Sequence, residues 1–148
     1  MPDSKLRLPK PKFSNHPVDV GFRTEAAILS ELGRRGHSIL VPWGVNQRYD
    51  LVIDLGGAFI RAQCKTGRLR NGVIRFSTQS IQCNRKRTLT RGYQGEVDVF
   101  LVYCPDTKHV YCVPIEEATD GCMYLRVKPT LNGQDRGVHW AADYELPA

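Results

Sequence analysis

Apolar residues recur along this chain with two different periods, and the change of period separates a helix from a series of strands. From residue 18 to residue 35 the apolar positions follow a helical spacing, and two arginines precede Gly36. Such spacing is typical of one face of a helix, and a glycine after basic residues is typical of a helix end. The pattern predicts a helix from Val18 or Asp19 to Arg35.

Shorter apolar runs bounded by turn residues predict strands over the rest of the chain. These runs cover residues 37–42, 48–55, 58–65, 73–76, 97–103, 110–113 and 124–127. The run 97–103 is the most apolar, which suits a central strand buried on both faces. Residues 114–118 predict a short helix, whereas the polar and basic residues 77–95 give no clear pattern. The predicted fold class is α/β or α+β, with a mixed central sheet flanked by helices.

The pair Gly56-Gly57 separates two of these runs and predicts a hairpin with a two-residue loop. Such a loop places Asp50 opposite Gln63, and directly opposed side chains lie about 5 Å apart at Cβ. Because alternate residues of a strand share a face, Lys65 lies on the face of Gln63. A carboxylate, an amide oxygen and an ammonium at one end of a hairpin outline a metal site with a basic neighbour. The alternative is a polar hairpin end that only faces water.

A second carboxylate comes from the predicted helix. Glu25 falls on its apolar stripe of Phe22, Leu29 and Leu32. A carboxylate that faces a core is costly unless something pairs with it. Glu25 is therefore either directed at a site on the sheet, or turned outward or bonded to an arginine.

Positive charge is concentrated after the hairpin. The net charge is +6, yet residues 61–91 contain nine basic residues and no acidic one, so the rest of the chain is net acidic. A long run of one sign favours a polyanion, with nucleic acid as the leading candidate. The alternative is that acidic residues elsewhere, such as Glu116 and Glu117, fold back onto the run. The basic residues are Arg61, Lys65, Arg68, Arg70, Arg75, Arg85, Lys86, Arg87 and Arg91.

Composition indicates a single domain over residues 18–148, preceded by a flexible basic arm of residues 1–17 that contains four prolines. No apolar stretch is long enough for a membrane span and no secretory signal is evident. The five cysteines include no CxxC pair, which favours reduced thiols in the cytoplasm. Cys104, His109 and Cys112 could be drawn as zinc ligands, but a fourth ligand is missing.

The order Glu25, Asp50 and then Gln63-Cys64-Lys65 resembles the PD-(D/E)xK nuclease superfamily. It is most similar to the subgroup in which glutamine replaces the second acidic residue, which includes homing endonucleases encoded in group I introns and related bacterial nucleases. Residues 21–25, 48–51, 63–67, 97–100, 111–114 and 140–144 carry the resemblance. It implies a restriction-endonuclease-like core and a metal-dependent endonuclease that hydrolyses phosphodiester bonds of double-stranded DNA.

The resemblance implies that Glu25, Asp50, Gln63 and Lys65 are catalytic. Asp50, the Gln63 amide oxygen and the backbone carbonyl of Cys64 would hold Mg²⁺ or Mn²⁺, and Lys65 would orient the attacking water. Because an amide is uncharged, this site should hold its metal more weakly than one with a second carboxylate.

The same reading makes Arg48 and the basic run the DNA-binding surface, with nine candidate residues. They are Arg48, Arg61, Arg68, Arg70, Arg75, Arg85, Lys86, Arg87 and Arg91. Cutting both strands of a duplex takes two active sites, so we expect a homo-oligomer, either a dimer or a tetramer. The alternatives are a Holliday-junction-resolvase-like nuclease and a non-catalytic DNA-binding protein that retains the fold.

Overall fold

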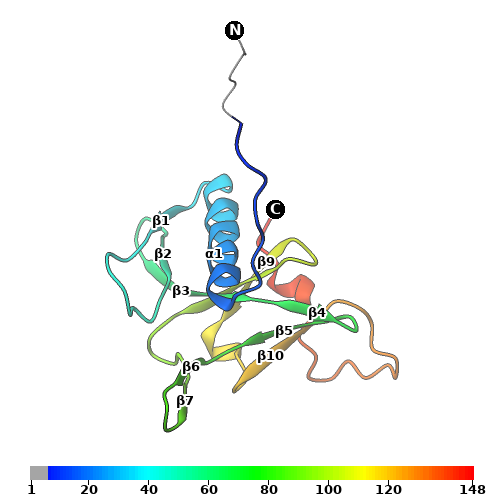
Figure 1. The fold of residues 1–148 in the computed structure, drawn as a ribbon. Helices are drawn as coiled ribbons and strands as arrows, with labels where there is room; N and C mark the ends of the chain where they lie inside the picture. The colour runs from blue at the N-terminus through cyan, green and yellow to red at the C-terminus, as the bar shows by residue number, and fades with distance from the viewer. Residues whose placement is uncertain (1–6) are drawn as a thin grey trace.

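The computed structural model describes residues 7–148, and its centre is a mixed sheet of five strands (Figure 1). In spatial order the strands are β1 (Ser38–Leu40), β2 (Leu51–Asp54), β3 (Phe59–Thr66), β8 (Val99–Cys104) and β9 (His109–Pro114). β3 and β8 are parallel, and the other neighbours are antiparallel. The predicted fold class is confirmed, although residues 7–148 contain one α-helix, α1 (Pro17–Arg34), where flanking helices were expected.

A second sheet of three strands packs on the face of the first sheet that α1 leaves free. It consists of β4 (Arg68–Arg70), β5 (Val73–Ser77) and β10 (Cys122–Arg126), in the order β10-β5-β4. A separate hairpin is formed by β6 (Ser80–Cys83) and β7 (Thr88–Arg91), and two short 3₁₀ helices, η1 (Ile115–Glu117) and η2 (Ala141–Tyr144), complete the fold. The hairpin covers part of residues 77–95, for which the sequence pattern predicts no element.

The helix α1 has the predicted extent but not the predicted face. The ring of His16 caps its start by accepting from the amide of Val18 at 3.3 Å, and Gly36, just past its end, has a φ of 82°. Phe22 was expected in the core, yet it is 73% exposed. The buried positions of α1 are Thr24, Ile28 and Leu32. These lie four residues apart, so the buried stripe is rotated from the predicted one.

Two apolar cores lie on opposite sides of the central sheet. Ile28 and Leu32 of α1 pack with Leu101 of β8, whereas Phe100 and Val102 pack with the second sheet. The expectation that this strand is central and buried on both faces is confirmed. Ala62 and Cys64 of β3 belong to the α1 side. Because side chains alternate along a strand, residues 61, 63 and 65 face the other side.

The hairpin β2–β3 has the predicted register within its strands. Ile53 pairs with Ile60, and the amide of Leu55 donates to the carbonyl of Ala58 at 2.9 Å across the Gly56-Gly57 loop. Gly56 has a φ of 85°, a conformation that glycine adopts without steric cost. Local chemistry thus sets the pairing on which the candidate site depends.

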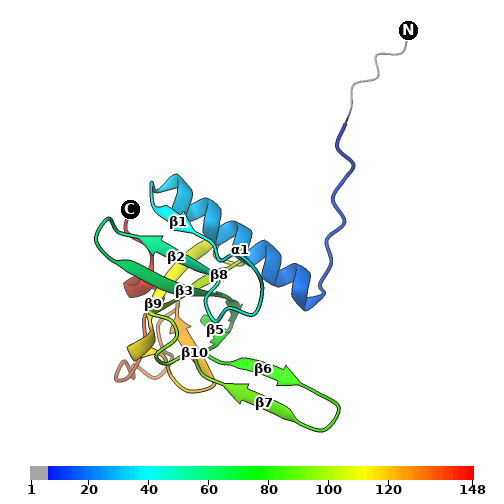
Figure 2. The ribbon, with the colours of Figure 1, turned by 90° about the vertical axis from the view of Figure 1, so that its left-hand side faces the viewer.

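The hairpin β6–β7 projects from the body of the protein (Figures 1 and 2). Every residue from 81 to 92 is exposed, so this hairpin is held only at its base. The described part of the N-terminal arm, residues 7–16, also extends away from the domain (Figure 2). The remainder of the predicted arm, residues 1–6, lies outside the described residues.

The cysteines do not build a zinc site. All five are free thiols; Cys104 pairs with His109 across β8 and β9, but Cys112 packs toward the core on the α1 side. Within residues 7–148 no three side chains drawn from histidine, cysteine, aspartate and glutamate come together to hold a metal. Within the same residues, no helix has the length and apolar character needed to cross a membrane.

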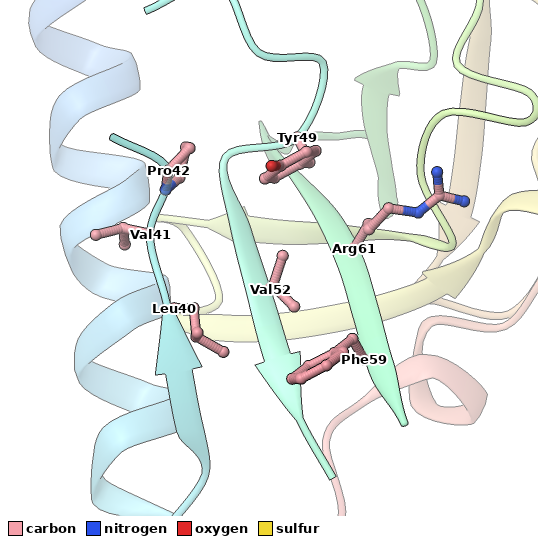
Figure 3. Close-up of a pocket in the computed structure, with 7 residues that line it drawn as sticks. All are labelled: Leu40, Val41, Pro42, Tyr49, Val52, Phe59 and Arg61. Carbon is pink, nitrogen blue, oxygen red and sulfur yellow. The ribbon is translucent and has the colours of Figure 1, made fainter. Parts of the chain in front are cut away.

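Apolar side chains remain exposed on the face of β1, β2 and β3 opposite α1, where Leu40 is 47% and Phe59 66% exposed. An apolar concavity of about 380 Å³ lies there, and Figure 3 shows the side chains that line it. Its lining residues are Leu40, Val41, Pro42, Tyr49, Val52, Phe59 and Arg61. Phe59 and Arg61 share a face of β3 with Gln63 and Lys65. The concavity therefore lies on the same face of the sheet as two of the candidate site residues.

Candidate active site

Asp50 lies immediately before β2 and departs from the register of the hairpin. Its amide donates to the carbonyl of Ala62 at 2.8 Å. In an uninterrupted antiparallel ladder, residues 50 and 63 would form a non-hydrogen-bonded pair, and the Asp50 amide would make no bond to β3. Since Ala62 is already the partner of Leu51, two residues face one, as in a β-bulge. The prediction that Asp50 is directly opposite Gln63 is therefore wrong by one residue.

The bulge turns the carboxylate of Asp50 toward the backbone of β3. Its Oδ2 accepts a hydrogen bond from the amide of Cys64 at 2.8 Å. β3 runs on to Thr66, whereas β2 begins at Leu51, which pairs with Ala62. The Cys64 amide therefore has no partner in β2, and it donates to the Asp50 carboxylate instead. The carbonyl of Cys64 points to the same side of the strand. A carboxylate oxygen and a backbone oxygen thus meet at the open end of the hairpin.

Glu25 approaches this point from the helix. The hydroxyls of Thr24 and Thr66 are 2.6 Å apart, which pins α1 against the end of β3. Partial burial, followed by the neighbouring Asp50 carboxylate, raises the pKa of Glu25. Burial also raises the pKa of the Cys64 thiol, and Asp50 and Glu25 add to that effect. Both carboxylates therefore act on the same residue of β3.

Lys65 is held on the opposite face of β3 from Cys64. Its Nζ donates to the carbonyl of Gln79 at 3.2 Å and to the hydroxyl of Tyr93 at 3.3 Å. Burial lowers the pKa of Lys65 to about 8, although the Asp50 carboxylate acts in the other direction. Burial likewise raises the pKa of Asp50, opposed by its hydrogen bond from Cys64 and by the charge of Lys65. A carboxylate and an ammonium, both poorly hydrated, flank one strand end.

Three of the arginines expected to bind DNA are engaged by acidic residues of the protein itself. Arg48 and Arg91 both bond Glu96. The guanidinium of Arg61 bonds Asp98 through its terminal nitrogen at 3.1 Å. The acidic partners of the basic run are thus Glu96 and Asp98. Glu116 and Glu117, the examples named for the alternative in which acidic residues fold back onto the run, form no ion pair with it within residues 7–148.

The remaining basic residues of the run, apart from Lys65, are exposed and form no ion pair within residues 7–148. Three of them form the hairpin tip, residues 84–87, where the side chain of Asn84 accepts from the amides of Lys86 and Arg87 at 3.0 and 2.9 Å. The six residues are Arg68, Arg70, Arg75, Arg85, Lys86 and Arg87. Positive charge is therefore available on β4, on β5 and at the hairpin tip.

Tyr93 and Gln79 contact Lys65, yet the sequence pattern does not single them out. Both lie in residues 77–95, where polar and basic residues hide any strand period. Tyr93 is the one aromatic residue of that segment, and it is 4% exposed. A single aromatic residue in a polar stretch is a weak sign that the segment packs against the core at that point. This sign could have marked Tyr93 as a buried residue.

Comparisons with known proteins identify the family and the fold. Residues 15–147 match the model of a family described as PD-(D/E)XK endonuclease. The chain is also similar to a bacterial homing endonuclease, I-Ssp6803I, with a TM-score of 0.70 and 20% sequence identity over 84% of this chain and 85% of that chain. That likeness shows a common fold. No curated protein matches the sequence.

Proposed function

We propose that this chain, which belongs to the PD-(D/E)XK endonuclease family, hydrolyses phosphodiester bonds of double-stranded DNA with a divalent metal ion. The observation that carries the proposal is the convergence of Asp50 and Glu25 beside the backbone of Cys64, with Lys65 on the same strand end. The fold shared with a homing endonuclease supports an activity of that type.

The residues at this point fit a hard divalent cation. Burial raises the pKa of Asp50, and partial burial together with Asp50 raises the pKa of Glu25, so a cation between them would stabilise both charged forms. Asp50, Gln63 and the Cys64 carbonyl would hold it, and all three are the oxygen ligands that Mg²⁺ and Mn²⁺ prefer. Because Gln63 is neutral, Asp50 would supply the only direct negative charge of this set.

The protein groups around the ion have separate tasks. When bound, the ion would supply positive charge against the negative charge that develops on the scissile phosphate. Lys65 has three N–H donors, of which two are used by Gln79 and Tyr93, so the third can orient the attacking water. Glu25 would accept a proton or a hydrogen bond from a water on the helix side.

The exposed basic residues would follow the phosphates on either side of the cut. Phosphate contacts position a duplex without reading its sequence. Each phosphate neutralised lowers the logarithm of affinity by about 0.9 per tenfold rise in salt. The six exposed residues on β4, on β5 and at the hairpin tip are the members of the basic run that this role fits.

We further propose that the active form is a homo-oligomer, because a chain with one site cannot cut both strands of a duplex in one encounter. Exposed apolar surface such as the concavity in Figure 3 is typical of protein interfaces and supports association. Sedimentation equilibrium should give two or four times the mass of 16.7 kDa. A monomer at micromolar concentration would contradict this part of the proposal.

The experiment that tests the function is cleavage of plasmid, linear duplex and four-way-junction DNA, followed on gels in Mg²⁺, Mn²⁺ or EDTA. We expect nicked and linear products with either metal and none in EDTA. Cleavage restricted to the junction would indicate a resolvase. DNA binding without cleavage under all metals would indicate a non-catalytic protein, and cleavage in EDTA would contradict the metal role.

A further inference from the structure

Both protein groups that hold Lys65 come from the base of the β6–β7 hairpin. Gln79 directly precedes β6, and Tyr93 follows the end of β7 by two residues. Their oxygens lie 3.2 and 3.3 Å from Nζ. β6 and β7 are paired next to these two residues, because Ser80 pairs with Arg91. We define the hairpin base as Gln79, Ser80 and residues 91–93. The segment that carries the basic tip therefore also sets the position of the Lys65 ammonium.

Arg48 closes the hairpin base from the other side. Its guanidinium donates to the Ser80 hydroxyl at 2.8 Å and to the Gly92 carbonyl at 2.6 Å, and it bonds Glu96. It lies 4.1 Å from the centroid of the Tyr93 ring, within the range of a cation–π contact. Arg48, from the segment before β2, thus links the two strands of the hairpin at its base and covers the Tyr93 ring.

The Tyr93 ring has little freedom to move. It is 4% exposed and meets the ring of Phe100 edge-on, with centroids 5.6 Å apart and planes at 90°. Phe100 belongs to the central strand β8, so the ring is anchored in the core. A hydroxyl on such a ring has a fixed place, and a lysine that bonds it loses the freedom of its flexible side chain.

We infer that Tyr93 and Arg48 are positioning residues for Lys65: Arg48 locks the Tyr93 ring against the hairpin base, and the Tyr93 hydroxyl with the Gln79 carbonyl fixes the ammonium. The inference rests on the catalytic role of Lys65 in the proposed function. It explains why Arg48, although basic and near the site, is turned to protein acceptors. It also connects the surface proposed for DNA binding with the group proposed to act on the water.

The test uses Tyr93→Phe, which removes the hydroxyl but keeps the ring, its packing and its cation–π contacts. The matched control is Tyr111→Phe. Tyr111 is also buried, at 1% exposed, and its hydroxyl bonds Thr107 at 2.9 Å, away from Lys65. Two quantities are measured on the full chain: the single-turnover cleavage rate at saturating duplex with Mg²⁺, and the dissociation constant for the same duplex in EDTA.

We expect Tyr93→Phe to lower the cleavage rate by about ten-fold to a hundred-fold, because a small misplacement of a catalytic group has effects of this size. The dissociation constant should stay within about two-fold, since a neutral hydroxyl removes no phosphate contact. Tyr111→Phe should change neither quantity. An unchanged rate in Tyr93→Phe, or an equal loss in Tyr111→Phe, would overturn the inference.

A second readout does not require cleavage. The rate of Lys65 acetylation by a water-soluble reagent is followed by mass spectrometry, with Lys86 at the hairpin tip as internal reference. Loss of one hydrogen bond should raise Lys65 reactivity about five-fold in Tyr93→Phe and not in Tyr111→Phe. If the wild type cuts no DNA but this change is seen, the proposed function fails and the positioning contact stands. If the wild type cuts DNA and Lys65 reactivity is unchanged, the inference fails alone.

Discussion

The tip and the base of the β6–β7 hairpin both carry arginine, yet the two ends use it differently. At the tip, Arg85 and Arg87 are exposed and form no ion pair within residues 7–148. At the base, Arg48 and Arg91 bond Glu96, and Arg48 adds hydrogen bonds to both stems. The arginines at the tip remain available to bind a partner, whereas Arg48 and Arg91 bond other groups of the protein and hold its segments together.

A count of basic residues therefore overestimates how many of them can bind DNA. An arginine that bonds a carboxylate presents little net positive charge to a phosphate, so it displaces few of the counterions condensed on DNA. Arg61 is a further example, since it bonds Asp98 and the Gly95 carbonyl. Substitutions at the two ends of the hairpin should therefore separate affinity from rate.

The largest effect should come from the strand end next to the hairpin base. We expect Asp50→Asn and Lys65→Ala each to lower the cleavage rate by several powers of ten, roughly 4 kcal/mol in barrier, because each removes a group that we propose acts on the reacting phosphate or water. Duplex affinity should change little. Plasmid cleavage and anisotropy measure the two quantities.

Asp54→Asn is the matched control for Asp50. Asp54 lies on the same strand, but its carboxylate accepts from the amide of Gly56 in the hairpin loop at 2.8 Å. This variant should cut DNA at the wild-type rate. Near wild-type cleavage by Asp50→Asn or Lys65→Ala would show that the site lies elsewhere.

The next effect concerns the tip. Replacing Arg85, Lys86 and Arg87 together with alanine should lower duplex affinity and flatten the salt slope by about two to three, because each phosphate contact contributes about 0.9. Most of the loss should appear in affinity and little in the rate at saturating DNA. Fluorescence anisotropy at several salt concentrations measures the slope.

The control for this triple variant is replacement of Lys108, Lys128 and Arg136, which removes the same charge from exposed positions outside the basic run. It should reduce the slope far less. If the two triple variants lose affinity equally, net charge governs binding and the tip has no special role.

The smallest effect should come from Arg48→Lys at the hairpin base. Lysine keeps the charge but lacks the planar fork that reaches Ser80 and Gly92. We expect the single-turnover rate to fall by about ten-fold, in line with a small displacement of Lys65, with the salt slope unchanged. An unchanged rate in Arg48→Lys would show that the guanidinium fork does not position Lys65.

Local sequence chemistry predicted the parts of the fold that rest on neighbours in the chain. The Gly56-Gly57 loop and its flanking β-branched runs set the β2–β3 register, and the glycine after Arg35 marks the end of α1. The same local order brought Asp50 and Gln63-Cys64-Lys65 to one hairpin end. The match of residues 15–147 to the endonuclease family bears out the resemblance seen in that order.

Other features were decided by contacts between segments far apart in sequence. The exposure of Phe22 depends on which side of α1 meets the sheet. The hairpin of residues 80–91 has a polar, exposed surface, so no apolar period marks it. An apolar period marks an element that buries one face, so a hairpin that buries little surface shows almost no such period.

The sequence by itself determined a mixed α and β domain of the endonuclease family, with the candidate acidic, amide and basic site residues in order along one helix and one hairpin. Only the tertiary structure decided which charges are free. Arg48 is 48 residues from Glu96 in sequence, and Arg61 is 37 from Asp98. An ion pair forms where folding brings two charges within a few ångströms of each other. The spacing of residues along the chain does not determine that distance.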